Sequence, residues 1–220
     1  MMVRIKKTIF EYKSFFYLYF TFLVIAGLAL VIFSKEETFF FVNGRFSSMA
    51  DFFFRGITGL GDGLFFALIT LVLAIYRYRL ALMGLVIFLS SSLVAQVLKN
   101  TLFSGFKRPY GVFGDDSRVH LVEGVAIYVK NSFPSGHTTT AFALAVFLVL
   151  AFGLKRSGWL LALAAMLVGY SRVYLAQHFP VDVYYGSLIG VITCLVMYSW
   201  LDQPLRSRFG DKGLMANSKR

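Results

Sequence analysis

Cysteine, histidine and acidic residues are all scarce in this sequence. Its one cysteine, Cys194, excludes an intrachain disulfide and argues against a thiolate metal site. Lys and Arg number 22 against 11 Asp and Glu, giving a net charge of +11, but there is no basic surface interleaved with aromatic residues to suggest nucleic-acid binding. The basic residues flank apolar runs instead, which is typical of membrane topology signals. Cys194 lies within such a run, where a small buried side chain is expected.

What the chain has in abundance is apolar sequence. Hydrophobic residues make up 58% of it and its mean hydropathy is +0.70, whereas soluble domains are about 45–50% apolar. Residues 14–34 carry no charge, and such a run is long enough to cross a hydrocarbon core of roughly 30 Å. Basic residues precede this run as in a signal peptide, but the run is too long and no cleavage site follows. We therefore expect an uncleaved first membrane helix.

Apolar segments predict an all-α integral membrane protein, with residues 1–220 forming one domain built as a six-transmembrane-helix bundle. The expected helices span residues 14–34, 57–76, 80–98, 137–154, 157–176 and 182–201. With both termini in the cytoplasm, most Lys and Arg residues lie inside and most Asp and Glu residues lie outside. This orientation places segments 35–56, 99–136 and 172–181 on the non-cytoplasmic face.

The first outer loop and the segment after it have unusual compositions. Seven phenylalanines in 39–54 are mixed with charged residues, which suits a short interfacial helix, although a loop packed on the bundle is an equal alternative. Residues 59–63 resemble a phosphate-binding loop, but no strand precedes them and no Gly-Lys-Ser/Thr follows. We interpret these glycines as a flexible entry into the second helix. The basic tail after Asp202 is expected to be poorly ordered.

Polar residues gather where the third to sixth helices reach the outer face. Charges at membrane depth are costly, so such a gathering predicts a functional site. Lys99, Arg108 and Arg172 supply three positive charges, and the arginines offer forks that match phosphate oxygens. Ser135 and Gly136 stand at the start of a helix, where backbone N–H groups favour an anion. Together these residues predict an oxyanion-binding site.

Two histidines and a carboxylate would complete that site. One of His137 and His178 could attack phosphorus while the other protonates the leaving oxygen. Asp182 follows His178 by four residues and could hold one ring nitrogen as N–H. Alternatively, each histidine could be a satisfied polar residue, and Asp182 could serve only a helix dipole. A zinc site formed by these three side chains is disfavoured because the nearby cations would repel a metal.

Three segments carry a resemblance to a known family: Lys99 through Arg108-Pro109, Pro134-Ser135-Gly136-His137, and Ser171-Arg172-Val173-Tyr174-Leu175-Ala176-Gln177-His178-Phe179-Pro180-Val181-Asp182. They resemble the signatures of the type 2 phosphatidic acid phosphatase family, which includes glucose-6-phosphatase and the vanadium haloperoxidases. The resemblance implies that His178 is a nucleophile forming a phosphohistidine, that Asp182 orients it, and that His137 is the general acid. It also implies that Lys99, Arg108, Arg172, Ser135 and Gly136 bind the phosphoryl group, without metal or other cofactor.

The first segment departs from the family pattern. Six residues usually separate the lysine from Arg-Pro, whereas eight lie between Lys99 and Arg108, and Thr101 occupies the expected position. Lys107 adjoins Arg108 and would point the opposite way in an extended segment. We therefore expect Lys99 to bind phosphate. His120, in the long loop, is expected to be a solvated residue or a headgroup contact.

These features predict a metal-independent lipid phosphatase in a bacterial cytoplasmic membrane, acting at the periplasmic or outer face. The resemblance suggests undecaprenyl diphosphate, phosphatidylglycerophosphate, phosphatidic acid or lipid A as the substrate. The expected partners are this lipid phosphate and membrane lipids, with no nucleic acid. A non-catalytic lipid-binding or transport protein is the alternative, but it would not need an acid and a nucleophile. A haloperoxidase is a third possibility, which the membrane helices disfavour.

Overall fold

The computed structural model describes residues 1–114, 116–210 and 212–213, and over these residues the chain is helical, with no strand. The elements are α1 (Met2–Glu11), α2 (Lys13–Ile32), α3 (Lys35–Asn43), α4 (Ser48–Ile57), the 3₁₀ turn η1 (Thr58–Gly61), α5 (Gly63–Tyr76), α6 (Tyr78–Asn100), α7 (Pro109–Phe113), α8 (Gly136–Ala151), α9 (Gly158–Tyr174) and α10 (Pro180–Phe209). The predicted all-α class is confirmed.

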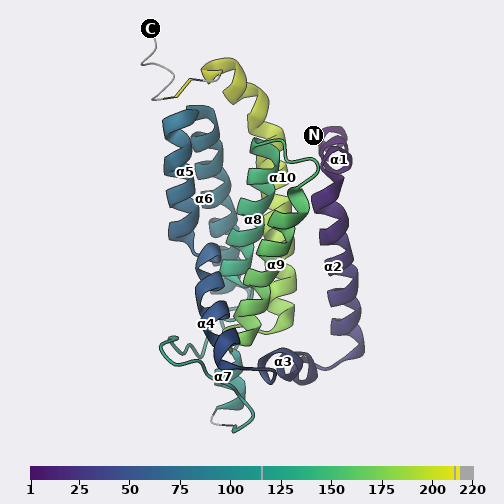
Figure 1. Ribbon diagram of the computed structural model, residues 1–220, viewed down its shortest axis with the longest axis vertical. Helices are drawn as coiled ribbons and strands as arrows, with labels where there is room; N and C mark the ends of the chain where they lie inside the picture. The colour runs from purple at the N-terminus through teal and green to yellow at the C-terminus, as the bar shows by residue number, and fades with distance from the viewer. Residues whose placement is uncertain (115, 211, 214–220) are drawn as a thin grey trace.

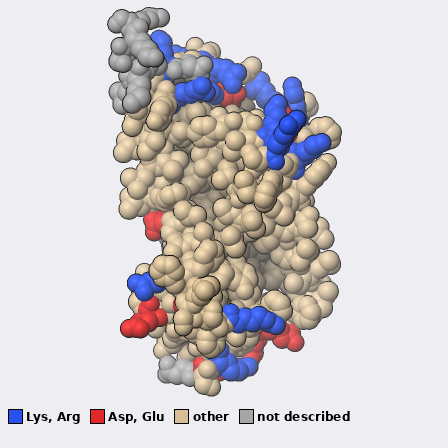
Figure 2. Space-filling model, viewed as in Figure 1, with Lys and Arg blue, Asp and Glu red and all other residues tan. Residues whose placement is uncertain are grey.

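The long helices α2, α5, α6, α8, α9 and α10 run along the long axis of the molecule (Figure 1). Helix α8 lies at the centre, packed against α6, α9 and α10, and 12 of its 16 residues are buried. Helix α1 and the end of α10 lie at one end, whereas α3, α7 and the long loop lie at the other (Figure 1). Figure 2 shows charged side chains gathered towards both ends, with a largely uncharged middle.

Length and composition identify three helices that could cross a membrane, namely α2, α6 and α10. The segment α4–η1 together with α5 passes the same test as a pair bent by 54°, which would make four. Helices α8 and α9 are apolar but have only 16 and 17 residues, fewer than the roughly 20 that span a hydrocarbon core. Because other helices surround α8, it meets little of any lipid.

The predicted helix 57–76 is wrong at its beginning. Asp62 has an extended backbone, with ψ of 141°, and its side-chain oxygen accepts a hydrogen bond of 2.8 Å from the backbone N–H of Leu64. Asp62 therefore caps α5, which begins at Gly63. The glycine-rich segment before it is an ordered 3₁₀ turn rather than a flexible entry.

The aromatic outer loop folds into two short helices, α3 and α4. Ser34 and Glu37 form a capping box that starts α3. Phe39 is fully buried against Phe113 and Phe179, as expected for a segment packed on the bundle. Phe52 on α4 is 84% exposed. The segment thus combines packing on the bundle with an outward aromatic face.

Helix α10 continues eight residues beyond its predicted end at residue 201, so the expectation of a poorly ordered tail after Asp202 is wrong as far as Phe209. Two contacts with other helices hold this extension. The guanidinium of Arg79 on α6 donates to Asp202 at 2.6 Å, and Arg4 on α1 donates to Gln203 at 2.7 Å. Pro204 is accommodated within the helix.

Helices α8 and α10 approach so closely that glycine is required on α10. A Cβ atom at Gly190 would lie 2.3 Å from the carbonyl oxygen of Thr139, and one at Gly186 would lie 2.7 Å from that of Ser135. Small residues four apart allow helix backbones to meet in this way in membrane proteins. The approach matters for function because it brings the N-terminus of α10 against the N-terminus of α8.

We predict that Gly190→Ala destabilises the protein by about 1–3 kcal/mol, the usual effect of overpacking. Gly56→Ala is the matched control, because a Cβ atom there meets nothing within 4 Å. The apparent melting temperature in detergent can be followed with a fluorogenic thiol dye, since the single cysteine, Cys194, is fully buried. Equal melting temperatures for the two variants would contradict the proposed close packing.

Candidate active site

All the predicted site residues lie at the end of the bundle opposite α1. They lie at the end of α6 (Lys99), in the segment before α7 (Arg108), at the start of α8 (Ser135, Gly136 and His137), at the end of α9 (Arg172), in the α9–α10 turn (His178) and in the first turn of α10 (Asp182). Segments far apart in the sequence therefore meet here.

The carboxylate of Asp182 links three segments of the site. Its Oδ2 accepts hydrogen bonds from the hydroxyl of Ser132 at 2.5 Å and from the backbone N–H of Phe179 at 2.9 Å. The same oxygen lies 3.4 Å from Nδ1 of His178. Both His178 and Asp182 are 1% exposed. A carboxylate in this position favours a proton on Nδ1 and leaves the other ring nitrogen with its lone pair.

The local sequence explains this arrangement. Ala176 adopts a left-handed backbone, with φ of 53°, so the chain turns sharply after α9. The backbone N–H groups of Gln177 and His178 both donate to the carbonyl of Arg172 and close the turn. Pro180 then starts α10 with its preset φ. His178 and Asp182 are held together by backbone geometry as well as by their side chains.

Burial keeps His178 neutral. It lowers the pKa of the imidazole to about 3, with the positive charges of Arg108 and Arg172 acting in the same direction and Asp182 opposing them. Above that pH the ring carries no charge, so its second nitrogen is free to act as a nucleophile.

Gln177 lies between the two arginines of the site. Its side-chain Oε1 accepts from Nη1 of Arg108 at 3.2 Å and from Nη2 of Arg172 at 3.5 Å. Its Nε2 donates to the carbonyl of Ala126 in the long loop at 2.9 Å. Arg108 also donates through Nε to the carbonyl of Lys130. One carboxamide thus spaces two cations that would otherwise repel each other.

The start of α8 supplies the third part of the site. Ser135 is its N-cap and is fully buried, and its hydroxyl contacts that of Thr138 at 2.9 Å. Its backbone N–H donates to the carbonyl of Asp182 at 3.1 Å, so this N–H is not available to a ligand. A Cβ atom at Gly136 would meet nothing within 4 Å, so open space lies in front of this helix start. The side chain of His137 is 33% exposed.

Lys99 and Lys107 differ in their surroundings. Lys99 is partly buried at the end of α6, where its charge interacts with those of Arg108, Arg172 and Asp182. Lys107 is exposed. The structure therefore places Lys99, and not Lys107, among the other charges of the site.

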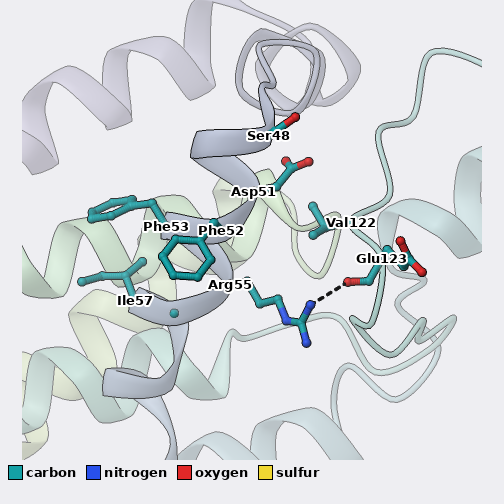
Figure 3. Close-up of a pocket in the computed structure, with 9 residues that line it drawn as sticks. Ser48, Asp51, Phe52, Phe53, Arg55, Ile57, Val122 and Glu123 are labelled. Atoms are coloured by element: carbon teal, nitrogen blue, oxygen red, sulfur yellow. Dashed lines mark hydrogen bonds between the residues drawn. The ribbon is translucent and has the colours of Figure 1, made fainter.

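Other potential sites are separate from this cluster. Among the described residues, no three His, Cys, Asp or Glu side chains converge as metal ligands would, so the zinc alternative lacks a third ligand. A groove of about 820 Å³ runs along α4 beside Val122 and Glu123, and Arg55 crosses it to donate to the Glu123 carbonyl (Figure 3). None of the predicted site residues lines this groove.

The expectation for His120 was wrong. Its side chain is 14% exposed, stacks on Phe46 at 3.9 Å between ring centroids, and lies 2.8 Å through Nε2 from Asp51. Asp51 also accepts from the hydroxyl of Tyr174. The side-chain amide of Asn43 donates to the carbonyl of His120 and accepts from the backbone N–H of the same residue. His120 therefore anchors the long loop to α3, α4 and α9.

Comparison with known protein families shows which family the chain belongs to. The family model described as the PAP2 superfamily matches residues 79–206, which is more than half of the sequence. The chain belongs to the PAP2 superfamily. This is the family that the three sequence segments resemble, and the match includes all of them.

Relatives within the PAP2 superfamily include lipid phosphatases. A lipid A 4'-phosphatase of Bacteroides thetaiotaomicron is 28% identical over 162 residues, covering 68% of this chain and 69% of the relative. The undecaprenyl-diphosphatase BcrC of Bacillus subtilis is 35% identical over 71 residues, covering 32% of this chain and 36% of the relative. The chain matches only about a third of the length of the first three curated relatives (34%, 36% and 32%).

A solved structure is similar over most of the chain. The crystal structure of Aquifex aeolicus LpxE superposes with a TM-score of 0.64 and 30% identity, covering 74% of this chain and 93% of that one. The candidate membrane-spanning helices, in a chain of the PAP2 superfamily, identify it as an integral membrane protein.

Sequence reasoning missed three polar residues beside the predicted site. Ser132 binds Asp182, Gln177 bridges the arginines, and Asp62 lies 4.0 Å from His137. Gln177 lies inside the third segment, directly before His178, and this position in the sequence could have indicated a role beside the site. Ser132 precedes the second segment by one residue. Asp62 comes from a distant glycine-rich turn, and only the fold reveals its position.

We predict that Lys99→Ala reduces kcat/KM by roughly 100- to 1000-fold, the usual cost of removing a contact to developing charge. Lys107→Ala should lose less than about tenfold, because its exposed ammonium affects the site only through long-range charge. Both variants should be assayed in one detergent with one lipid substrate. The reverse ranking would mean that Lys107 binds the phosphate.

Proposed function

We propose that this PAP2 protein is a lipid phosphatase that hydrolyses a phosphate or diphosphate monoester of a membrane lipid through a phosphohistidine at His178. The observation that carries the proposal is the buried pair of His178 and Asp182 beside Lys99, Arg108 and Arg172. A neutral imidazole amid fixed cations suits attack on an anionic phosphoryl group. A protein that only bound lipid phosphate would gain nothing from that pair.

The first step would form a bond between the free ring nitrogen of His178 and phosphorus. The bond from phosphorus to the lipid oxygen breaks, and His137 gives that oxygen a proton. The three cations, the Ser135 hydroxyl and the N–H of Gly136 would hold the phosphoryl oxygens. In the second step His137 takes a proton from water, whose oxygen bonds to phosphorus while the bond between phosphorus and the His178 nitrogen breaks, and inorganic phosphate is released. His178 then returns to its neutral form. Neither step requires a metal ion.

We propose a lipid A phosphate as the first substrate to examine, ahead of undecaprenyl diphosphate, phosphatidylglycerophosphate and phosphatidic acid. Among the relatives described above, the lipid A 4'-phosphatase is matched over 69% of its length. The undecaprenyl-diphosphatase is matched over only 36% of its length. The long loop, residues 99–136, contacts Gln177 and Arg108 through the carbonyls of Ala126 and Lys130, and we propose that it selects the headgroup.

We propose that α2, η1 with α5, α6, α8, α9 and α10 form six spans, with both termini in the cytoplasm and α4 at the membrane interface. Arg4, Lys7, Lys155 and Arg206 are four of the basic residues at the α1 end of the bundle. An excess of basic residues at one end marks the cytoplasmic side. The site would then open on the outer face of a bacterial cytoplasmic membrane.

Phosphate release from purified lipids tests the activity. We predict release from at least one of the four lipids at the same rate with and without excess chelator. His178→Ala should be inactive, and rapid acid-free quenching should trap phosphate on the wild-type chain but not on the variant. Activity that requires an added divalent cation, or no release from any lipid, would contradict the proposal.

Labelling of introduced cysteines tests the orientation. Ser117 in the long loop and Ser207 near the end of α10 are both exposed, and they lie at opposite ends of the bundle. An impermeant thiol reagent should label Ser117→Cys in intact cells and Ser207→Cys only after permeabilisation. The wild-type chain is the control, because Cys194 is buried. The opposite pattern would reverse the orientation.

A further inference from the structure

The turn that links α4 to α5 packs directly on the active site, although none of the three family segments includes it. A Cβ atom at Gly61 would lie 2.7 Å from the carbonyl oxygen of His137 and 2.6 Å from Val168. The backbone of this turn therefore approaches the start of α8 as closely as only glycine allows. Thr58 fixes the other end of the turn, since its hydroxyl accepts a 2.7 Å hydrogen bond from Arg172.

Asp62 follows this anchored turn, and its two carboxylate oxygens face different groups. Oδ1 accepts the backbone N–H of Leu64 and caps α5. Oδ2 lies 4.0 Å from Nε2 of His137. This distance is longer than a hydrogen bond, so the interaction with His137 is one between charges. The capping bond holds the carboxylate in place and directs its second oxygen towards the imidazole.

The charges that face His137 explain why a carboxylate matters there. They belong to Arg172 on α9, Asp62 in the turn, Arg108 before α7 and Lys99 on α6. Three of these four groups are cations that bind the phosphoryl group, and all three oppose a positive imidazole. A general acid must nevertheless carry its proton when the substrate arrives. Asp62 is the one anion among these four groups, and its charge favours a positive imidazole.

We propose that Asp62 is a positioning residue that favours the protonated form of His137, the form that gives a proton to the leaving-group oxygen. The inference rests on the proposed function, because it assigns a partner to the acid of that reaction. The cations that would bind the substrate phosphate disfavour the positively charged form of His137. Asp62 is not one of the phosphate-binding residues, and its negative charge opposes this effect.

Asp62→Asn separates this role from helix capping. Asparagine retains an oxygen for the Leu64 N–H and is as good an N-cap as aspartate, so only the charge is lost. Asp62→Ala loses both the charge and the cap. The apparent melting temperature of Asp62→Asn should therefore match the wild type, while that of Asp62→Ala should be lower.

The pH–rate profile is the decisive measurement. Activity falls at high pH as His137 loses its proton, so removal of an anion should move the alkaline limb to lower pH. A carboxylate within 4–6 Å shifts such a limb by about one unit or more, but Asp62 is 55% exposed, so roughly half to one unit is expected after screening. The acid limb should not move, because the charges facing His178 are Asp182, Arg108 and Arg172.

Leaving-group dependence gives a second readout. At a pH just above the wild-type alkaline limb, Asp62→Asn should lose about three- to tenfold with a lipid phosphate, as that limb shift implies. It should lose little with p-nitrophenyl phosphate, whose leaving group needs no proton. Two results would overturn the proposal: an unchanged alkaline limb in a stable Asp62→Asn protein, or equal losses on both substrates.

His137→Ala distinguishes failure of this inference from failure of the proposed function. If His137→Ala loses activity selectively with the lipid substrate but Asp62→Asn has no effect, His137 is the acid and Asp62 serves only the cap. If His137→Ala shows no leaving-group dependence, the acid assignment itself fails, and the role of Asp62 fails with it.

Discussion

The site depends on one buried carboxylate, that of Asp182. Through its side chain it holds Ser132, the backbone of Phe179 and the ring of His178, and through its carbonyl it accepts the N–H of Ser135. Burying an isolated charge would cost several kcal/mol, so a carboxylate that is 1% exposed must be satisfied by donors. The donors to the carboxylate come from the loop before α8 and from the α9–α10 turn, while the start of α8 is tied to the backbone carbonyl of the same residue. Satisfying one charge therefore fixes the relative positions of the segments that carry the two histidines.

A second constraint is the repulsion among cations. Lys99, Arg108 and Arg172 interact with one another at the end of an apolar bundle, where water screens charges poorly. Asp182 neutralises part of this charge, and Gln177 supplies an oxygen to both arginines without adding a negative charge. The set retains an excess of positive charge, which an entering phosphate would neutralise. Such a site is complementary to an anion rather than to a metal ion. It also explains why the acid of the proposed reaction would benefit from a carboxylate of its own.

The sequence predicted the parts of this structure that local rules determine. Long uncharged runs gave the positions of the helices, and a histidine and an aspartate four residues apart at a helix start gave their pairing. What it could not predict arises from packing between distant segments. The break at Asp62 depends on a capping bond and on the fit of the turn against α8. His120 has the sequence surroundings of a loop residue, yet Phe46 and Asp51 bury it. Helices α3 and α4 create its environment. The sequence does not distinguish an interfacial helix from a loop packed on the bundle in that region, so it could not predict this burial.

The bundle itself explains why these groups meet. Helix α8 is short, but because α6, α9 and α10 enclose it, its N-terminus lies inside the bundle. Gly186 and Gly190 bring α10 against it, so the partial positive charges of two helix starts are close together. Both favour an anion, and Asp182 occupies the start of α10 while the space beside Gly136 at the start of α8 is open. In the proposed reaction, the start of α10, which Asp182 occupies, would orient His178, and the start of α8 would be available to the substrate. Close packing between two apolar helices thus brings together both halves of the proposed phosphate site.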